Sequence, residues 1–181
     1  HDLQLPMDEA AETLSAIRGG EIDALVVFYF AGHGALVGAH DLRLLLADSE
    51  RSRKDESTLP VRQVIQALEN KRAAEWAVIL DCCESGEVTR DMAIQGIRTR
   101  TNRGSLIACA TSSGSVWETP EHGAPFTSCL TEAIRTGSCM PLGSEFVDIL
   151  RAATWAKDKL PEPRPIVDHW GSADLRVART P

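Results

Sequence analysis

Two residues of this chain, His33 and Cys83, have side chains that could together carry out acyl transfer. His33 belongs to the stretch AGHG and Cys83 to the stretch DCCESG, so both are accompanied by small residues. A thiol becomes a strong nucleophile when a neighbouring base or cation stabilises its thiolate. A histidine flanked by glycines can approach such a thiol closely. These residue types therefore predict a nucleophilic Cys83 that is activated by His33.

Each motif follows a short apolar run that is rich in β-branched and aromatic residues. ALVVFYF (residues 24–30) leads into AGHG, and WAVIL (residues 76–80) leads into DCCESG. Runs of this length and composition are typical of strands that are buried on both faces. We expect the first strand to stop at Gly32 and the second to run into Asp81.

Helix-like segments alternate with strand-like segments along the chain. We expect further strands at residues 42–47, 105–111 and 174–178, and helices at residues 6–17, 61–70, 125–134 and 145–153. Such alternation predicts an α/β fold with a mostly parallel central sheet flanked by helices. Ligands of parallel sheets bind beyond the carboxyl ends of the strands, so the two motifs should meet there.

The segments VVFYFAGHG and WAVILDCCESG resemble the paired sequence blocks of the caspase-like peptidases, and of metacaspases in particular. The separation of about 50 residues between His and Cys is that of caspase-type sites. SLIACATSSGSVWE and GAPFTSCLTEAI resemble the strand, loop and helix that follow in this family. The resemblance implies a single caspase-hemoglobinase-like three-layer sandwich over residues 1–181. The first strand and helix of that fold have no counterpart, so we expect the chain to be part of a longer protein.

The resemblance also implies a role for each residue of the two motifs. His33 would be the general base and Cys83 the nucleophile, and backbone N–H groups near Gly34 and Cys83 would stabilise the oxyanion. Cys82 occupies the family's small-residue position, and strand alternation would point its side chain away from that of Cys83. The sequence departs from the family pattern at Glu84, where a histidine commonly follows the nucleophile.

Substrate recognition is inferred from the same resemblance. Metacaspase-like enzymes have an acid two residues before the nucleophile that receives a basic P1 side chain, and here that residue is Asp81. A carboxylate pairs well with a guanidinium, so we expect cleavage after Arg or Lys. The loop SSGSVWE resembles the one that lines the substrate cleft, although Trp117 could equally be an ordinary packing residue. The remaining candidates are Ser112, Ser113, Trp117 and Glu118 for substrate binding, and Arg98, Arg100 and Arg103 for self-cleavage.

Composition restricts the class of partner and the compartment. The chain has 26 acidic and 19 basic residues, a formal net charge of −7, which argues against nucleic acid as the principal ligand. Its five cysteines have neither disulfide-framework nor zinc-site spacing, which favours a reducing, cytoplasmic setting. No apolar run approaches the roughly 20 residues that span a membrane.

We expect no cofactor. Asp48 resembles an acid that contributes to calcium binding in some metacaspases, but a loop Asp is usually a turn residue.

Two other functions remain open at this point. A caspase-like scaffold could bind partners without turnover, although the presence of both His33 and Cys83 speaks against it. A flavodoxin-like regulatory domain would not require GHG or DCCESG, and the chain has no glycine-rich phosphate loop. By resemblance to bacterial relatives, we expect a protein substrate, a sensor or repeat module or partner chain, and a role in defence or regulated cell death.

Overall fold

A six-stranded sheet forms the centre of the protein. The computed structural model describes residues 8–12, 15, 25–37, 41–50, 57–69, 75–83, 104–110, 125–161, 166–171 and 175–180. The strands of this sheet lie in the order β3-β2-β1-β4-β5-β7. Their bounds are β1 Leu25–Val37, β2 Asp41–Leu45, β3 Thr58–Pro60, β4 Glu75–Cys83, β5 Gly104–Ala110 and β7 Ile166–Gly171.

Parallel pairing is restricted to the centre of this sheet. β1, β4 and β5 are parallel to one another, whereas β2 and β3 on one side and β7 on the other pair antiparallel to their neighbours. The sheet is therefore mixed, and the expectation of a mostly parallel sheet is not confirmed outside the three central strands. Those three strands still bring their carboxyl ends to one edge, which is where the α/β architecture places its ligands.

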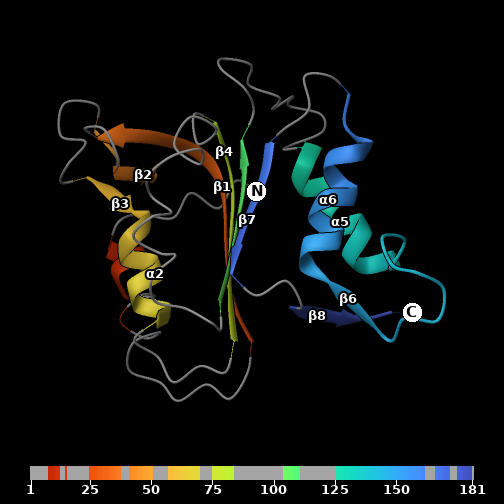
Figure 1. The fold of residues 1–181 in the computed structure, drawn as a ribbon. Helices are drawn as coiled ribbons and strands as arrows, with labels where there is room; N and C mark the ends of the chain where they lie inside the picture. The colour runs from red at the N-terminus through yellow and green to blue at the C-terminus, as the bar shows by residue number, and fades with distance from the viewer. Residues whose placement is uncertain are drawn as a thin grey trace.

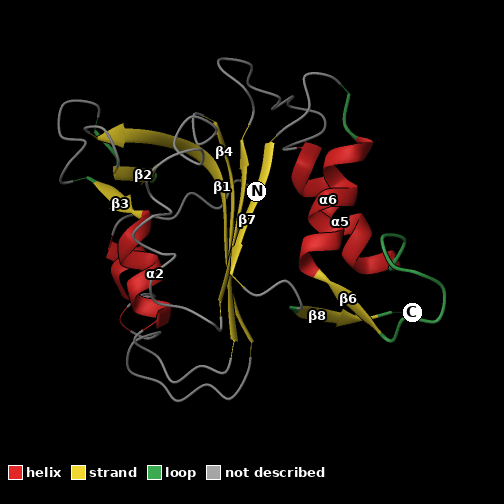
Figure 2. Ribbon diagram, viewed as in Figure 1, coloured by secondary structure: helices red, strands yellow, loops and turns green. Residues whose placement is uncertain are grey.

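Helices cover both faces of the sheet, which gives an α/β sandwich (Figure 1). On one face lies α2 (Val61–Glu69), and on the other lie α5 (Pro125–Thr136) and α6 (Ile149–Lys159). A two-stranded ribbon of β6 (Phe146–Asp148) and β8 (Arg176–Arg179) lies beside α6, apart from the main sheet (Figure 2).

Each face of the sheet has its own hydrophobic core. α2 is amphipathic and buries its apolar side against alternate residues of β4, Trp76, Val78 and Leu80. The intervening residues of β4, Ala77 and Ile79, are buried on the opposite face against α5 and α6. Successive side chains of a strand point to opposite faces, so β4 contributes to both cores. Its residues from Trp76 to Leu80 are all buried.

β1 differs from the prediction in length and in burial. It does not stop at Gly32 but continues through His33 to Val37. It is also not buried on both faces, because Val27 and Tyr29 are 45% and 40% exposed on the side that carries α5 and α6. The prediction of a strand is confirmed, but on this side β1 contributes the partly buried Leu25 to the core and leaves Val27 and Tyr29 largely exposed.

The other predicted elements are confirmed with shifted bounds or in part. The strands expected at residues 42–47, 76–81, 105–111 and 174–178 correspond to β2, β4, β5 and β8, and the helices at 61–70 and 125–134 to α2 and α5. The helix predicted at 145–153 begins only at Ile149, since residues before it form β6. β3 and β7 were not predicted. Of the first predicted helix, residues 8–12 and 15 are helical and the rest lies outside the described residues.

Candidate active site

His33 and Cys83 are paired in register across the two central parallel strands. The pairing of β1 with β4 runs from Leu25 opposite Glu75 to His33 opposite Cys83, which is its last pair. Neighbouring strands lie about 4.8 Å apart, so the two backbones are as close as strand pairing permits. This register agrees with the prediction that the motifs AGHG and DCCESG lie side by side.

β1 changes its partner immediately after His33. From Gly34 onward it pairs with β2, antiparallel, beginning with Gly34 opposite Leu44. His33 is exposed, whereas Gly34, the predicted oxyanion residue, is buried. The candidate base therefore lies at the boundary between two sheet segments, with its side chain accessible to a substrate.

Glycine is required at position 32 for two separate reasons. Its φ of 157° lies in a region that residues with side chains rarely adopt. A Cβ at this position would also lie only 3.0 Å from the ring of Phe30. Phe30 itself packs against the core under α2. The glycine before the histidine thus allows the aromatic ring to cover the backbone that carries His33.

Cys82, the alternative nucleophile, is part of the hydrophobic core. It is 3% exposed and lies with Trp76, Val78 and Leu80 in the cluster beneath α2. A thiol in this position cannot reach a peptide substrate without opening the core. Of the two adjacent cysteines, Cys83 at the end of β4 is the one left as a candidate.

Asp81, the predicted P1-binding acid, is half-buried and tied to α5. Its Oδ2 accepts a hydrogen bond of 2.6 Å from the hydroxyl of Thr127 in the first turn of that helix. The Thr127 hydroxyl in turn contacts the hydroxyl of Tyr29 in β1. A carboxylate that is bound in this way has a defined orientation two residues before Cys83.

Two further thiols belong to α5 and to the turn that follows it. Burial raises the pKa of Cys129 in α5 above its ordinary value, and the carboxylate of Glu132 raises it further. Burial likewise raises the pKa of Cys139, whose thiol is 3.8 Å from the carbonyl oxygen of Ala133. Both thiols therefore stay protonated at neutral pH and are poor nucleophiles.

Asp48, the calcium candidate, is an exposed residue of the turn after β2. The turn is closed by Ser49, whose side chain accepts from the N–H of Leu46 and donates to the carbonyl oxygen of Ser57. Among the described residues there is no group of three or more His, Cys, Asp or Glu side chains that could hold a metal ion. Nor does that part of the chain contain a helix that is long and apolar enough to cross a membrane.

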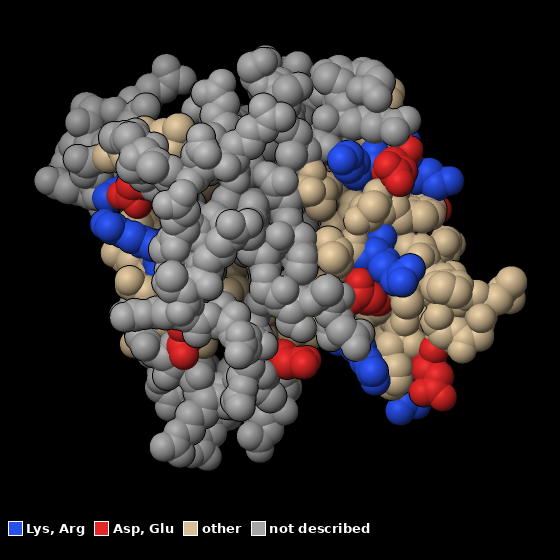
Figure 3. All heavy atoms as spheres, in the orientation of Figure 1, with Lys and Arg blue, Asp and Glu red and all other residues tan. Residues whose placement is uncertain are grey.

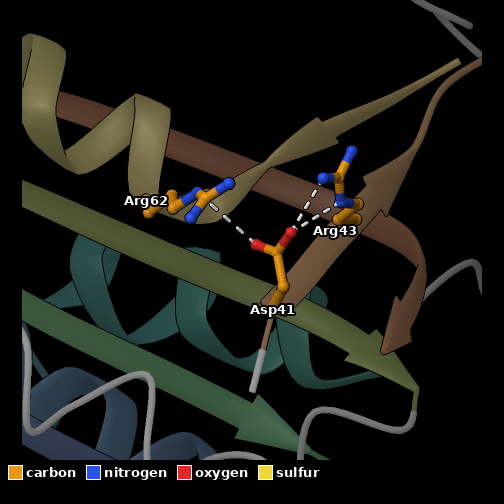
Figure 4. A network of polar contacts seen from close by, with 3 residues as sticks. All are labelled: Asp41, Arg43 and Arg62. Atoms are coloured by element: carbon orange, nitrogen blue, oxygen red, sulfur yellow. Dashed lines mark hydrogen bonds and ion pairs between the residues drawn. The ribbon is translucent and has the colours of Figure 1, made fainter. Parts of the chain in front are cut away.

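A partly buried ion pair lies in the outer part of the sheet (Figure 4). The guanidinium of Arg43 in β2 contacts Asp41 through two nitrogens, both at 2.8 Å from Oδ2. Arg62, in the first turn of α2, approaches the other oxygen of Asp41 at 3.7 Å. This network ties α2 to β2, the strand that pairs with β1 beyond His33.

Charged side chains of both signs are mixed on the surface. On the face in Figure 3, the described Lys and Arg residues are interspersed with Asp and Glu and do not gather into one basic patch. This distribution agrees with the acidic composition.

Several predicted site residues lie outside the described residues. They are the cleft-loop candidates Ser112, Ser113, Trp117 and Glu118, the cleavage candidates Arg98, Arg100 and Arg103, and the divergent Glu84. Conversely, Thr127 and Tyr29 were missed by the sequence analysis. Tyr29 is the one polar side chain in the run ALVVFYF, and that was the available signal.

Comparison with known proteins identifies the type of domain. A family model described as a caspase domain matches residues 4–159 of the chain. No curated protein sequence matches it. Among solved structures, protein GSU0716 from Geobacter sulfurreducens has 13% sequence identity and a TM-score of 0.49, over 92% of this chain and 77% of that one. At that identity and TM-score, the likeness adds nothing to the family match.

Proposed function

The chain belongs to the caspase domain family, and on that premise we propose that it is a cysteine endopeptidase with Cys83 as nucleophile and His33 as general base. The observation that carries the proposal is the register of His33 opposite Cys83 at the carboxyl end of β4. Two independent facts support it. His33 is exposed to a substrate, and Cys82, the competing thiol, is buried in the core.

The reaction would follow the usual course of thiol acyl transfer. The Cys83 thiolate attacks the carbonyl carbon of the scissile bond, and the developing oxyanion is stabilised by backbone N–H groups near Gly34 and Cys83. Protonated His33 gives its proton to the leaving amine. Water then attacks the thioester, with His33 again accepting a proton, and releases the new carboxylate and the free thiol. No step requires a cofactor, so activity should be equal in EDTA and in calcium.

We further propose that the enzyme cleaves protein substrates after Arg or Lys. Asp81 supports this specificity, because its half-buried carboxylate lies two residues before Cys83 and is oriented by Thr127. A fixed carboxylate recognises a guanidinium through paired hydrogen bonds. Fluorogenic peptides with Arg, Lys or Asp at P1 test it. Faster hydrolysis of the Asp peptide than of the Arg peptide would overturn the assignment.

Self-processing would follow from the same specificity. The segment after Cys83 contains Arg98, Arg100 and Arg103, which suit an enzyme that cuts after basic residues. Intact-mass analysis of the wild type beside Cys83→Ala tests this. We expect wild-type fragments that end at one of these arginines and an uncut variant. A wild-type chain that stays intact while it hydrolyses Arg peptides would contradict self-processing alone.

Regulation by a partner or sensor module remains part of the proposal, with a protein as the substrate. Its support is the family relationship, because a peptidase that acts on other proteins must be kept inactive until needed.

Reaction with an arginyl chloromethyl ketone distinguishes an active site from a scaffold. An active peptidase is labelled at Cys83 and loses labelling in His33→Ala, whereas slow labelling that is independent of His33 would contradict the proposed dyad.

A further inference from the structure

Asp81, Thr127 and Tyr29 form a chain of polar contacts that joins three elements of the fold. Asp81 belongs to β4, Thr127 to α5 and Tyr29 to β1. The bond from Thr127 to Asp81 is partly buried, and the contact between Thr127 and Tyr29 is exposed. These contacts are long-range in sequence, since Tyr29 and Thr127 are 98 positions apart.

The direction of this chain is fixed by the chemistry of its members. An ionised carboxylate only accepts hydrogen bonds, so the Thr127 hydroxyl must use its one proton for Asp81. The Thr127 oxygen can then only accept from Tyr29, which donates its phenolic proton. Hydrogen bonds that end on an ionised group are the stronger class, and the donor before it polarises the chain further.

The position of Thr127 is itself held by the core. Its neighbour Phe126 and Leu130, one turn further along α5, are 3% and 4% exposed and pack with Ala77 and Ile79 of β4. The helix therefore cannot shift along the sheet without losing these contacts. The carboxylate also meets the first turn of α5, where the helix dipole favours negative charge. The chain thus connects a rigid helix to the carboxylate.

From this arrangement we propose that Thr127 and Tyr29 are positioning residues that hold the Asp81 carboxylate in the orientation that selects Arg over Lys at P1. The proposal rests on the proposed function and adds the residues that set its preference. The planar guanidinium needs both carboxylate oxygens in a fixed plane, whereas the ammonium of Lys is a point charge that tolerates rotation. A carboxylate released from Thr127 would lose the Arg contact more than the Lys contact.

Thr127→Val tests the proposal, because it keeps the side-chain shape and removes the hydroxyl. We expect KM for the Arg peptide to rise about tenfold, the factor that corresponds to one hydrogen bond to a charged group. We expect kcat to change little and the preference for Arg over Lys to fall. Thr127→Ser should restore the wild-type values. Tyr29→Phe should act in the same direction but more weakly, because its contact is exposed.

A binding measurement separates this proposal from the proposed function. Benzamidine carries a planar amidinium, and its binding to Cys83→Ala, measured by calorimetry, needs no turnover. We expect Kd to rise about tenfold when Thr127→Val is added. The positioning role would be overturned if Cys83→Ala binds no benzamidine, or binds it equally well with and without Thr127→Val. It would also be overturned if Thr127→Val leaves KM and the preference for Arg unchanged.

Peptide hydrolysis and benzamidine binding test the two proposals separately. A wild type that hydrolyses no peptide contradicts the proposed function, while benzamidine binding still decides the role of Thr127. A wild type that cleaves Arg peptides with no effect of Thr127→Val contradicts the positioning role alone. If Thr127→Val does not fold, as judged by circular dichroism, Tyr29→Phe decides the question by the same KM and preference measurements.

Discussion

His33 and Cys83 lie opposite one another in the last pair of the parallel ladder between β1 and β4, one residue before β1 turns to β2 as its partner. At this point the sheet changes from parallel to antiparallel pairing. A histidine here is held by strand pairing on its amino-terminal side to β4 and on its carboxyl-terminal side to β2. The proposed base and the proposed nucleophile are thus both strand residues rather than loop residues.

Replacement of His33 should abolish most of the activity without unfolding the protein. We expect His33→Ala to lower kcat/KM for an Arg peptide by roughly 10²–10⁴-fold, the usual contribution of a general base. Val27→Ala is the matched control, because Val27 lies in the same strand, is 45% exposed and pairs with Ala77, away from Cys83. Similar losses in both variants would mean that β1 is disturbed in general and that His33 has no special role.

Gly32→Ala should reduce both stability and activity. The substitution forces a side chain into a φ of 157° and into a 3.0 Å contact with Phe30, which costs about 1–3 kcal/mol. Movement of Phe30 or of the backbone would also displace His33. Urea unfolding and peptide hydrolysis measure the two effects.

Gly143→Ala is the control for Gly32. Gly143 also has a positive φ, 85°, but an added Cβ would meet nothing within 4 Å. We expect it to lose about 1 kcal/mol of stability and to keep its kcat/KM. Equal activity of the two variants, corrected for the folded fraction, would contradict a special constraint at Gly32.

The ion pair of Asp41 and Arg43 should contribute more to stability than the contact with Arg62. Asp41→Ala removes two contacts of 2.8 Å to a guanidinium that is only 10% exposed, and we expect a loss of about 1–3 kcal/mol. Arg62→Ala removes a contact of 3.7 Å from a side chain that is 66% exposed, and we expect less than about 1 kcal/mol. Urea denaturation compares the two. A larger loss for Arg62→Ala would contradict the assignment.

The thiols should differ in their reaction with iodoacetamide as a function of pH. Because burial raises the pKa of Cys129 and Cys139, both remain protonated at neutral pH and should react slowly, becoming faster only under alkaline conditions. Cys82 should react only on unfolding, since it is 3% exposed. Among Cys82, Cys83, Cys129 and Cys139, peptide mapping at pH 7 should therefore find Cys83 modified first. Preferential modification of Cys129 or Cys139 at that pH would contradict the assigned environments.

The central features of the fold were predictable because they depend on local pattern. WAVIL is apolar throughout and is buried on both faces, as β4 must be between α2 and the pair α5 and α6. The spacing of Val61, Val64, Ile65 and Leu68 predicted α2, and all four are buried. The motifs at the ends of two such strands then predicted their meeting.

The features that were missed depend on contacts distant in sequence. ALVVFYF has the composition of a doubly buried strand, yet Val27 and Tyr29 are 45% and 40% exposed, because the burial of a strand face depends on which distant segments cover it. β7 follows a proline-rich stretch and forms only as the antiparallel partner of β5. Thr127 was hidden for the same reason, because its significance comes from Asp81, 46 positions away.

The proposed mechanism depends most directly on which cysteine is the nucleophile, and hydrolysis of an Arg peptide by Cys83→Ala and Cys82→Ala measures this. We predict that Cys83→Ala is folded and has no activity above background. We predict that Cys82→Ala retains most of its kcat/KM and loses some stability, about 1 kcal/mol, through the small space left in the core under α2. Activity in Cys83→Ala, or its complete loss in a folded Cys82→Ala, would contradict the assignment of Cys83 opposite His33 as the catalytic pair.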